Sequence, residues 1–241
     1  MRRLSILLAL TALAACERPD SRTDQALSAN GRIIAMSGGA GGANNACFAC
    51  HGLDGSGDGV STPRLAGLEA GYLQKQMEDY ASGLRADPVM TPVAKALDDR
   101  ARRAVVAYYA ELPTPSGGGT EPAPVVWSRG DPARGLQACA ACHGDRGQGV
   151  GGGQPALSGQ PEAYTRAQLD RWRLAKRRND PRGAMGDIAR KLTSAEVDAM
   201  AAWLRRRPAS PAPATDAASA SGAAEVAARS AAFREGRRLD R

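Results

Sequence analysis

One short pattern, C-x-x-C-H, occurs twice in this chain, and the two copies stand 92 positions apart. The first copy runs from Cys47 to His51 and the second from Cys139 to His143. Other residues repeat at the same spacing and then, after a small insertion, at a spacing of 95. Pro63, Leu65, Gly67, Tyr72 and Gln76 match Pro155, Leu157, Gly159, Tyr164 and Gln168, and Met90, Val93, Ala94, Lys95 and Leu97 match Met185, Ile188, Ala189, Arg190 and Leu192. Because the order of the matches is the same in both halves, the chain contains a duplicated domain.

Both repeats are predicted to be helical. Apolar residues recur at helical spacing in 70–82 and 163–176, and the segments 101–112 and 195–206 close the two repeats. No run of alternating β-branched residues suggests strands. The sequence therefore predicts an all-α fold of two tandem domains. The expected segments are a signal peptide at 1–15, a polar tether at 16–29, domains at 30–113 and 125–208, a Pro/Gly-rich linker at 114–124, and an Ala/Pro/Ser-rich tail at 209–241 that is mostly disordered.

The N-terminus has the features of an export signal. Arg2 and Arg3 precede an apolar run over 4–15, which is shorter than the about 20 residues that a membrane-spanning helix needs. The run ends in Leu-Ala-Ala-Cys16, similar to a bacterial lipobox, although Ala12-Leu13-Ala14 also fits plain secretory cleavage. The other four cysteines form two pairs, so an unlipidated Cys16 would be an odd free thiol. We expect a periplasmic lipoprotein anchored to the membrane through Cys16.

The C-x-x-C-H pattern is the attachment signal for heme c. Two thiols three positions apart reach the vinyl groups of one porphyrin, and the following histidine lies under the iron. A four-cysteine zinc site, a thioredoxin-like dithiol and two structural disulfides are the competing interpretations. The chain has two histidines, and each directly follows a C-x-x-C. We therefore predict two covalent heme c groups, held by Cys47 and Cys50 with His51 on the first iron, and by Cys139 and Cys142 with His143 on the second.

Each iron also needs a second axial ligand or an open position. The chain has no spare histidine, and its cysteines are all assigned, which leaves methionine and lysine. Of the six methionines, Met90 and Met185 alone align with each other, each expected in a loop before the last helix of its repeat. A lone methionine is more often a core residue, but the repeat makes these two the predicted axial ligands. A thioether prefers ferrous iron, so this ligation raises the reduction potential and leaves no position for substrate.

Pro63 and Pro155 follow the motifs at the same distance in each repeat. A backbone carbonyl at this position could accept the Nδ1 proton of the proximal histidine and so fix its orientation. Alternatively, each proline simply ends a Gly-rich loop.

The charge is unevenly distributed between the repeats. Residues 30–113 contain eight Lys/Arg and nine Asp/Glu, whereas residues 125–207 contain fifteen and eight. An exported protein rarely meets nucleic acid, so the basic half favours an acidic redox partner or an anionic membrane surface.

Over about residues 30 to 208 the chain resembles the class I cytochromes c, in particular the two-domain diheme type called cytochrome c-four. The resemblance rests on the paired C-x-x-C-H-G motifs, the P-x-L-x-G segments, Met90 and Met185, and the aromatic residues Tyr108 and Trp203 in the last helices. It implies a small helical bundle around each heme, a methionine distal ligand, and transfer of electrons to a terminal oxidase. A Gly-rich stretch at 37–43 and the long tail depart from the family pattern.

The expected function is a one-electron shuttle between a redox donor and an acceptor, in a respiratory chain. The alternative is the cytochrome subunit of a periplasmic dehydrogenase complex. A diheme peroxidase would need an open iron with acid–base groups beside it, which two methionine ligands and the lack of a spare histidine argue against. A lipoprotein whose hemes only stabilise its fold is the remaining interpretation.

Overall fold

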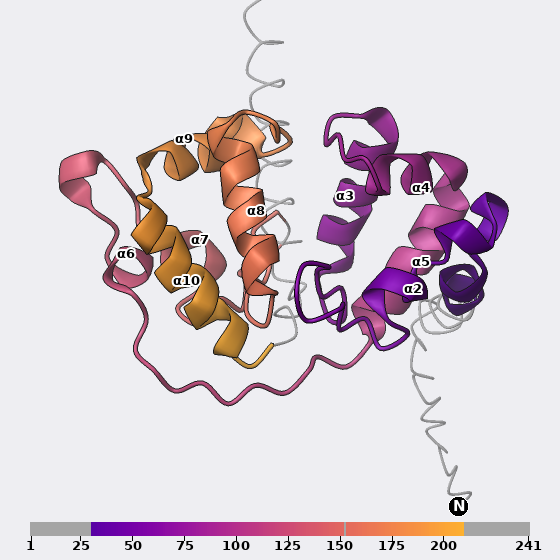
Figure 1. Cartoon of the computed structure of the whole chain (residues 1–241), viewed down its shortest axis with the longest axis horizontal. Helices are drawn as coiled ribbons and strands as arrows, with labels where there is room; N and C mark the ends of the chain where they lie inside the picture. Colours follow the sequence, from indigo (N-terminus) through magenta and orange to yellow (C-terminus); the bar gives the residue numbers. More distant parts are fainter. Residues whose placement is uncertain (1–29, 152, 210–241) are drawn as a thin grey trace, which may run out of the picture.

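The computed structural model describes residues 30–151 and 153–209, which form two helical domains lying side by side (Figure 1). Within these ranges there is no β-strand, and extended pairing is limited to two isolated bridges, Asp131 with Leu136 and Gly151 with Gln154. The predicted all-α fold is confirmed. No helix in the described part of the chain is long and apolar enough to cross a bilayer.

The helices of the two domains correspond in order. The first domain contains a helix at 30–37 and α2 (Phe48–His51), α3 (Ala70–Ser82), α4 (Met90–Ala96) and α5 (Asp99–Glu111), with 3-10 turns at Gly39–Gly41 and Ala43–Asn45. The second domain contains α6 (Val125–Ser128), α7 (Ala140–His143), α8 (Glu162–Arg173), α9 (Ala184–Lys191) and α10 (Ser194–Arg206), with 3-10 turns at Pro132–Arg134 and Pro181–Gly183. Helices α2 to α5 therefore repeat as α7 to α10.

Local capping explains where several of these helices begin and end. The Glu69 carboxylate accepts hydrogen bonds from the first N–H groups of α3, and Gly83 ends that helix in a left-handed conformation with φ of 83°. At the start of α10, Thr193 and Glu196 form the reciprocal pair of bonds of a capping box. Helix α8 ends three residues earlier than its sequence pattern indicates, because Ala175 takes a positive φ of 53°.

Each domain has its own hydrophobic core, and the aromatic residues of the two cores differ. Tyr108 and Tyr109 of α5 are buried in the first domain, whereas Trp127 of α6 and Trp203 of α10 are buried in the second. Ala156, from the second domain, packs into the core cluster of the first. The domains therefore share apolar contact as well as a covalent connection.

The connector at 114–124 has no helix or strand and runs along one side of both domains (Figure 1). It is nevertheless attached to α10. The N–H of Gly119 donates to the carbonyl of Arg206 at 2.9 Å, and the indole of Trp203 donates to the carbonyl of Glu121 at 3.1 Å. The Glu121 carboxylate pairs with Arg206 and Arg207. These contacts hold the connector against the second domain.

Candidate heme sites

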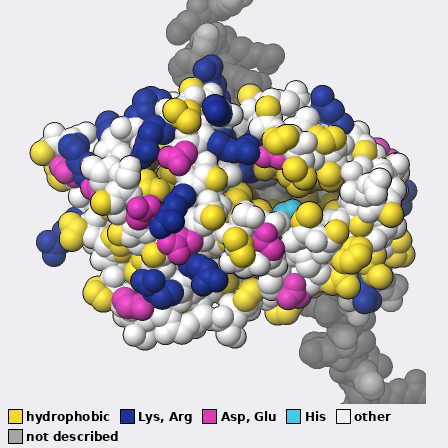
Figure 2. Space-filling model, in the orientation of Figure 1, with side chains coloured by type: hydrophobic (Ala, Val, Ile, Leu, Met, Phe, Trp, Pro, Cys, Tyr) yellow, Lys and Arg dark blue, Asp and Glu magenta, His cyan; other side chains and the backbone are white. Residues whose placement is uncertain are grey.

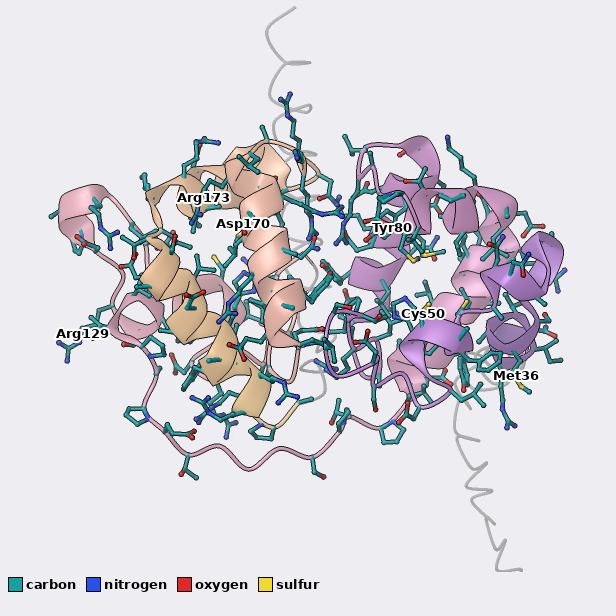
Figure 3. All side chains as sticks on the ribbon, viewed as in Figure 1. Met36, Cys50, Tyr80, Arg129, Asp170 and Arg173 are labelled. Carbon is teal, nitrogen blue, oxygen red and sulfur yellow. The ribbon has the colours of Figure 1, made fainter. Side chains whose placement is uncertain are left out.

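Each C-x-x-C-H motif forms one helical turn, and the turn arranges its side chains. The N–H of His51 donates to the carbonyl of Cys47 at 2.8 Å, and His143 donates to Cys139 at 2.9 Å. Residues four apart lie on the same face of a helix, so the first cysteine and the histidine of each motif share a face. Cys47 is half-buried, and Cys50 lies on α2 at the surface (Figure 3).

In both domains the histidine ring is oriented by the proline identified from the sequence. Nδ1 of His51 lies 3.0 Å from the carbonyl oxygen of Pro63, and Nδ1 of His143 lies 2.9 Å from that of Pro155. Burial lowers the pKa of both histidines, while the bond to the proline carbonyl acts in the opposite direction. Each ring is then a neutral imidazole that carries its proton on Nδ1. This tautomer leaves the Nε2 lone pair available to a metal ion.

Gly-rich loops bring the two prolines to the histidines. The N–H of Gly57 donates to the carbonyl of His51 at 2.9 Å, and the equivalent Gly149 donates to His143 at 2.8 Å. Gly57 has a φ of 76°, and a Cβ there would stand 2.3 Å from the carbonyl oxygen of Thr62. Only glycine tolerates both the positive φ and this approach, which explains the glycine at this position in both repeats.

An aromatic ring lies beside each histidine. The ring centroids of Tyr109 and His51 are 6.5 Å apart in an edge-on arrangement, and those of Trp127 and His143 are 6.4 Å apart. The hydroxyl of Tyr109 donates to the carbonyl of Gly52 at 3.0 Å and so links α5 to the end of the first motif. Neither Tyr109 nor Trp127 is evident from the sequence repeat, because the two rings come from different elements and do not align.

The expectation that Met90 and Met185 lie in loops is wrong. Met90 is the first residue of α4 and Met185 the second residue of α9, and both side chains are half-buried. Pro92 argued against a helix at the position of α4 in the sequence. A proline is nevertheless compatible with the first turn of a helix, because the N–H groups there lack intrahelical partners. Met185 packs against the core cluster that Cys139 also contacts. Met200 is a buried member of the same cluster, and Met77 packs against the core cluster of the first domain.

The surface over the first domain is hollowed (Figure 2). A histidine side chain is visible at the edge of this hollow, and hydrophobic side chains surround it. An apolar recess that ends at an imidazole is suited to a large flat cofactor with a metal at its centre.

The chemistry of these residues fits heme c better than the competing interpretations. The four motif cysteines are free thiols, so none is in a disulfide. No group of three or more His, Cys, Asp or Glu that could hold a metal ion occurs among the described residues. Burial raises the pKa of the Cys47 and Cys139 thiols to about 11, the reverse of what a redox-active dithiol needs. Paired thiols beside a neutral, oriented imidazole remain suited to attaching and ligating a heme.

Two buried arginines between the domains, Arg85 and Arg177, have no carboxylate partner among the residues that the structure describes. Arg85 donates to Gln76 at 2.8 Å, and also to Tyr164 and Gln168. Arg177 donates to Asn179 at 2.9 Å, and also to Gln168 and Gln76. Side chains from α3 and α8 fill this space, with Tyr80 on the side of the first domain (Figure 3). A buried guanidinium is stabilised by an anion. Arg85 and Arg177 are therefore the groups that could receive the carboxylates of bound hemes.

Comparison with known proteins agrees with this description of the site. The model of the cytochrome c family matches residues 37–113 and 134–207, one segment for each domain. The chain belongs to the cytochrome c family. It is similar to a thiosulfate dehydrogenase electron acceptor of Stutzerimonas stutzeri, with 43% identity over 187 residues, 74% of this chain and 87% of that protein. A cytochrome c4 of Thiocapsa roseopersicina is 38% identical over 172 residues, 68% of this chain and 88% of that one.

Among solved structures, a thiosulfate dehydrogenase from Marichromatium purpuratum matches with a TM-score of 0.66 and 38% identity. The match covers 78% of this chain and 41% of that one. These results show a diheme cytochrome c of the cytochrome c4 type, which transfers electrons and binds two heme c groups covalently. The predictions for Cys16, for the signal and tether at 1–29 and for the tail from 210 onward concern residues outside those that the structure describes.

Proposed function

We propose that this protein is a periplasmic, lipid-anchored electron carrier. It accepts single electrons from a dehydrogenase, with a thiosulfate-oxidising enzyme as the donor class, and passes them to a terminal oxidase of a respiratory chain. Cys47 and Cys50 attach the first heme, and Cys139 and Cys142 the second. His51 and Met90 complete the first iron site, and His143 and Met185 the second. Cys16 carries the lipid.

The observation that carries the proposal is the duplicated histidine–proline pair. In each domain an imidazole, buried for His51 and half-buried for His143, is held by a proline carbonyl at 3.0 or 2.9 Å, and a half-buried methionine lies in the first turn of α4 or α9. When bound, each heme supplies a one-electron iron couple. The protein holds the imidazole in one tautomer, and Met90 and Met185 would each supply a thioether ligand, so that side chains would complete the coordination of both irons. Such a site favours electron transfer over reaction with a substrate.

The relatives favour a dehydrogenase as the electron donor. Two proteins that are 43% and 39% identical to this chain are thiosulfate dehydrogenase electron acceptors, and one of the similar solved structures is that of a thiosulfate dehydrogenase. The dehydrogenase partner and the respiratory shuttle are compatible, because two hemes allow entry of electrons at one domain and exit at the other.

Rapid mixing of the oxidised protein with purified thiosulfate dehydrogenase and thiosulfate tests the donor. We expect both hemes to be reduced within the turnover time of the enzyme. In a second experiment the reduced protein is mixed with membranes that contain a single terminal oxidase, and reoxidation is expected. If the dehydrogenase does not reduce the protein but the oxidase oxidises it, the donor class is wrong and only the shuttle remains. If neither reaction occurs, the proposed function is wrong.

A further inference from the structure

The carboxylate of Asp87 fixes the beginning of helix α4, which carries Met90. Its Oδ1 accepts hydrogen bonds from the N–H groups of Val89 and Met90, both at 2.9 Å. The N–H of Asp87 in turn donates to the hydroxyl of Thr91 at 2.9 Å. A side chain that accepts the first N–H groups of a helix determines where the helix starts. The position of the Met90 backbone therefore depends on the orientation of Asp87.

The orientation of Asp87 is set from the other domain. Its second oxygen, Oδ2, lies 2.8 Å from Nη1 of Arg171, which belongs to α8. The two side chains are 17% and 33% exposed, so water screens this ion pair less than it would a pair on the open surface. One carboxylate thus connects the second domain to the backbone of Met90.

The second domain divides the same two tasks between two residues. At the spacing of 92, Arg171 corresponds to Asp79 and Asp87 to Asn179. Asn179 donates to Asp79 across the interface at 2.6 Å, the counterpart of the contact between Arg171 and Asp87. Asn179 does not cap the helix that carries Met185.

That cap is provided by the neighbouring Asp180, whose Oδ2 accepts from the N–H groups of Met185 at 2.7 Å and Gly186 at 3.3 Å. The repeat spacing changes from 92 to 95 between Gln168 and Met185, and in the second domain the interface contact and the cap are made by the adjacent residues Asn179 and Asp180. In the first domain both tasks fall on Asp87. The carboxylate that caps the helix of Met90 thus makes an ion pair with the neighbouring domain. Among the described residues Asp180 makes no such pair, and the first domain binds its neighbour Asn179 instead, through Lys75 and Asp79.

We propose that Arg171 is a positioning residue for Met90, so that the second domain stabilises methionine ligation at the first heme but the first domain does not do so at the second. This inference rests on the proposed function, in which Met90 is the distal ligand. The neutral variant Arg171→Gln is expected to let Asp87 rotate and the start of α4 loosen. An added ligand such as imidazole then competes better with Met90 for the iron.

The test is an imidazole titration of the full-length oxidised protein. The methionine methyl resonances of the two hemes are followed separately by NMR and assigned with Met90→Ala and Met185→Ala. Arg171→Gln is expected to raise the imidazole affinity of the first heme about fivefold, the effect of one partly exposed ion pair, and to leave the second heme unchanged. Asp87→Asn keeps an oxygen to cap the helix but loses the charge, and should reproduce this result. Arg171→Lys should restore most of the wild-type affinity.

Arg178→Gln is the matched control, because Arg178 is an exposed arginine whose hydrogen bond goes to Ala175 in its own domain. It should change neither heme. Equal changes at both hemes in Arg171→Gln, or no change in either, would overturn the positioning role. If Met90→Ala removes no methionine resonance, the ligand assignment itself is wrong. The two failures are therefore distinguishable.

Discussion

Arg85 and Arg177 each donate a hydrogen bond to the glutamine that belongs to the other's domain. Arg85 contacts Gln168 at 2.8 Å and Arg177 contacts Gln76 at 3.2 Å. Both pairs are equivalent positions of the repeat, 92 residues apart. The two guanidinium groups also stack on equivalent aromatic rings, Arg85 on Tyr80 and Arg177 on Trp172. The interface therefore has an approximate local symmetry that follows from the duplication.

Gln76 is the centre of this network, and its removal should weaken the interface. Its Oε1 accepts from Arg85, Arg177 and Asn179, all of them buried. Gln76→Leu would remove the acceptor of three buried donors, and each unsatisfied donor costs about 1–3 kcal/mol of folding stability. We expect the free energy of unfolding, measured with denaturant, to fall by about 3 kcal/mol or more.

Gln74→Leu is the matched control on the same helix, because its Oε1 is buried without a partner among the described residues. Its replacement should change stability by less than about 1 kcal/mol. Similar losses in the two variants would show that the shared acceptor is not what stabilises the interface.

Each of the two helices that carry a predicted methionine ligand has an arginine bound to a carbonyl group near its C-terminus, and the two arginines come from different helices. Arg102 of α5 donates to the carbonyl of Ala94 at 3.1 Å, and Arg173 of α8 donates to that of Ala189 at 3.2 Å. Arg173→Met should therefore weaken methionine ligation and lower the reduction potential of the second heme alone, and Arg102→Met that of the first alone. Spectroelectrochemical titration resolves the two potentials. Parallel shifts of both hemes in each variant would contradict the assignment.

The sequence predicted the helices that carry a clear helical period. The range 70–82 is the observed extent of α3, which lies between Glu69 and Gly83. The short helix α4 escaped prediction because seven residues are too few to show a helical period. The histidine–proline contacts were one of two open alternatives, and the structure contains them.

The interface could not be predicted from the sequence. Gln76 and Arg177 lie 101 positions apart. The local sequence around each of them indicates an ordinary solvent-exposed polar residue. Counted as surface charge, Arg177 contributes to the basic character of the second repeat, although its side chain is 5% exposed. Which polar residues become partners depends on how two finished domains dock, and the sequence pattern of one domain does not contain that information.

The lipid anchor at Cys16 is tested by cell fractionation. Replacement of Cys16 by serine should release the protein from membranes into the soluble periplasmic fraction, because the remaining apolar run is removed with the signal. The variant should keep both hemes, since Cys16 belongs to neither motif. A variant that stays with the membrane would show that another segment anchors the chain.

The capping box at the start of α10 predicts a loss of stability in acid. The hydrogen bond from Arg134, together with those from Thr193, lowers the pKa of Glu196 from 4.5 to about 2. A carboxylate whose pKa is lower in the folded state stabilises the fold above its unfolded pKa and loses this effect as the pH falls toward its folded pKa. The free energy of unfolding should differ between wild type and Glu196→Gln by up to about 1 kcal/mol at neutral pH. The difference should shrink between pH 4.5 and about 2. A difference that does not vary with pH would mean that ionised Glu196 contributes nothing.

Replacement of each predicted axial methionine should affect one heme and spare the other. Met90→Ala should remove one of two methionine methyl resonances in the reduced protein and lower the potential of the first heme, because a thioether stabilises ferrous iron. Met185→Ala should do the same at the second heme. Met77→Leu and Met200→Leu are the controls, since these methionines pack in the cores and leucine nearly conserves their volume. Loss of a resonance in Met200→Leu, whose sulfur lies 3.7 Å from Cys139 Sγ, would instead identify Met200 as a ligand.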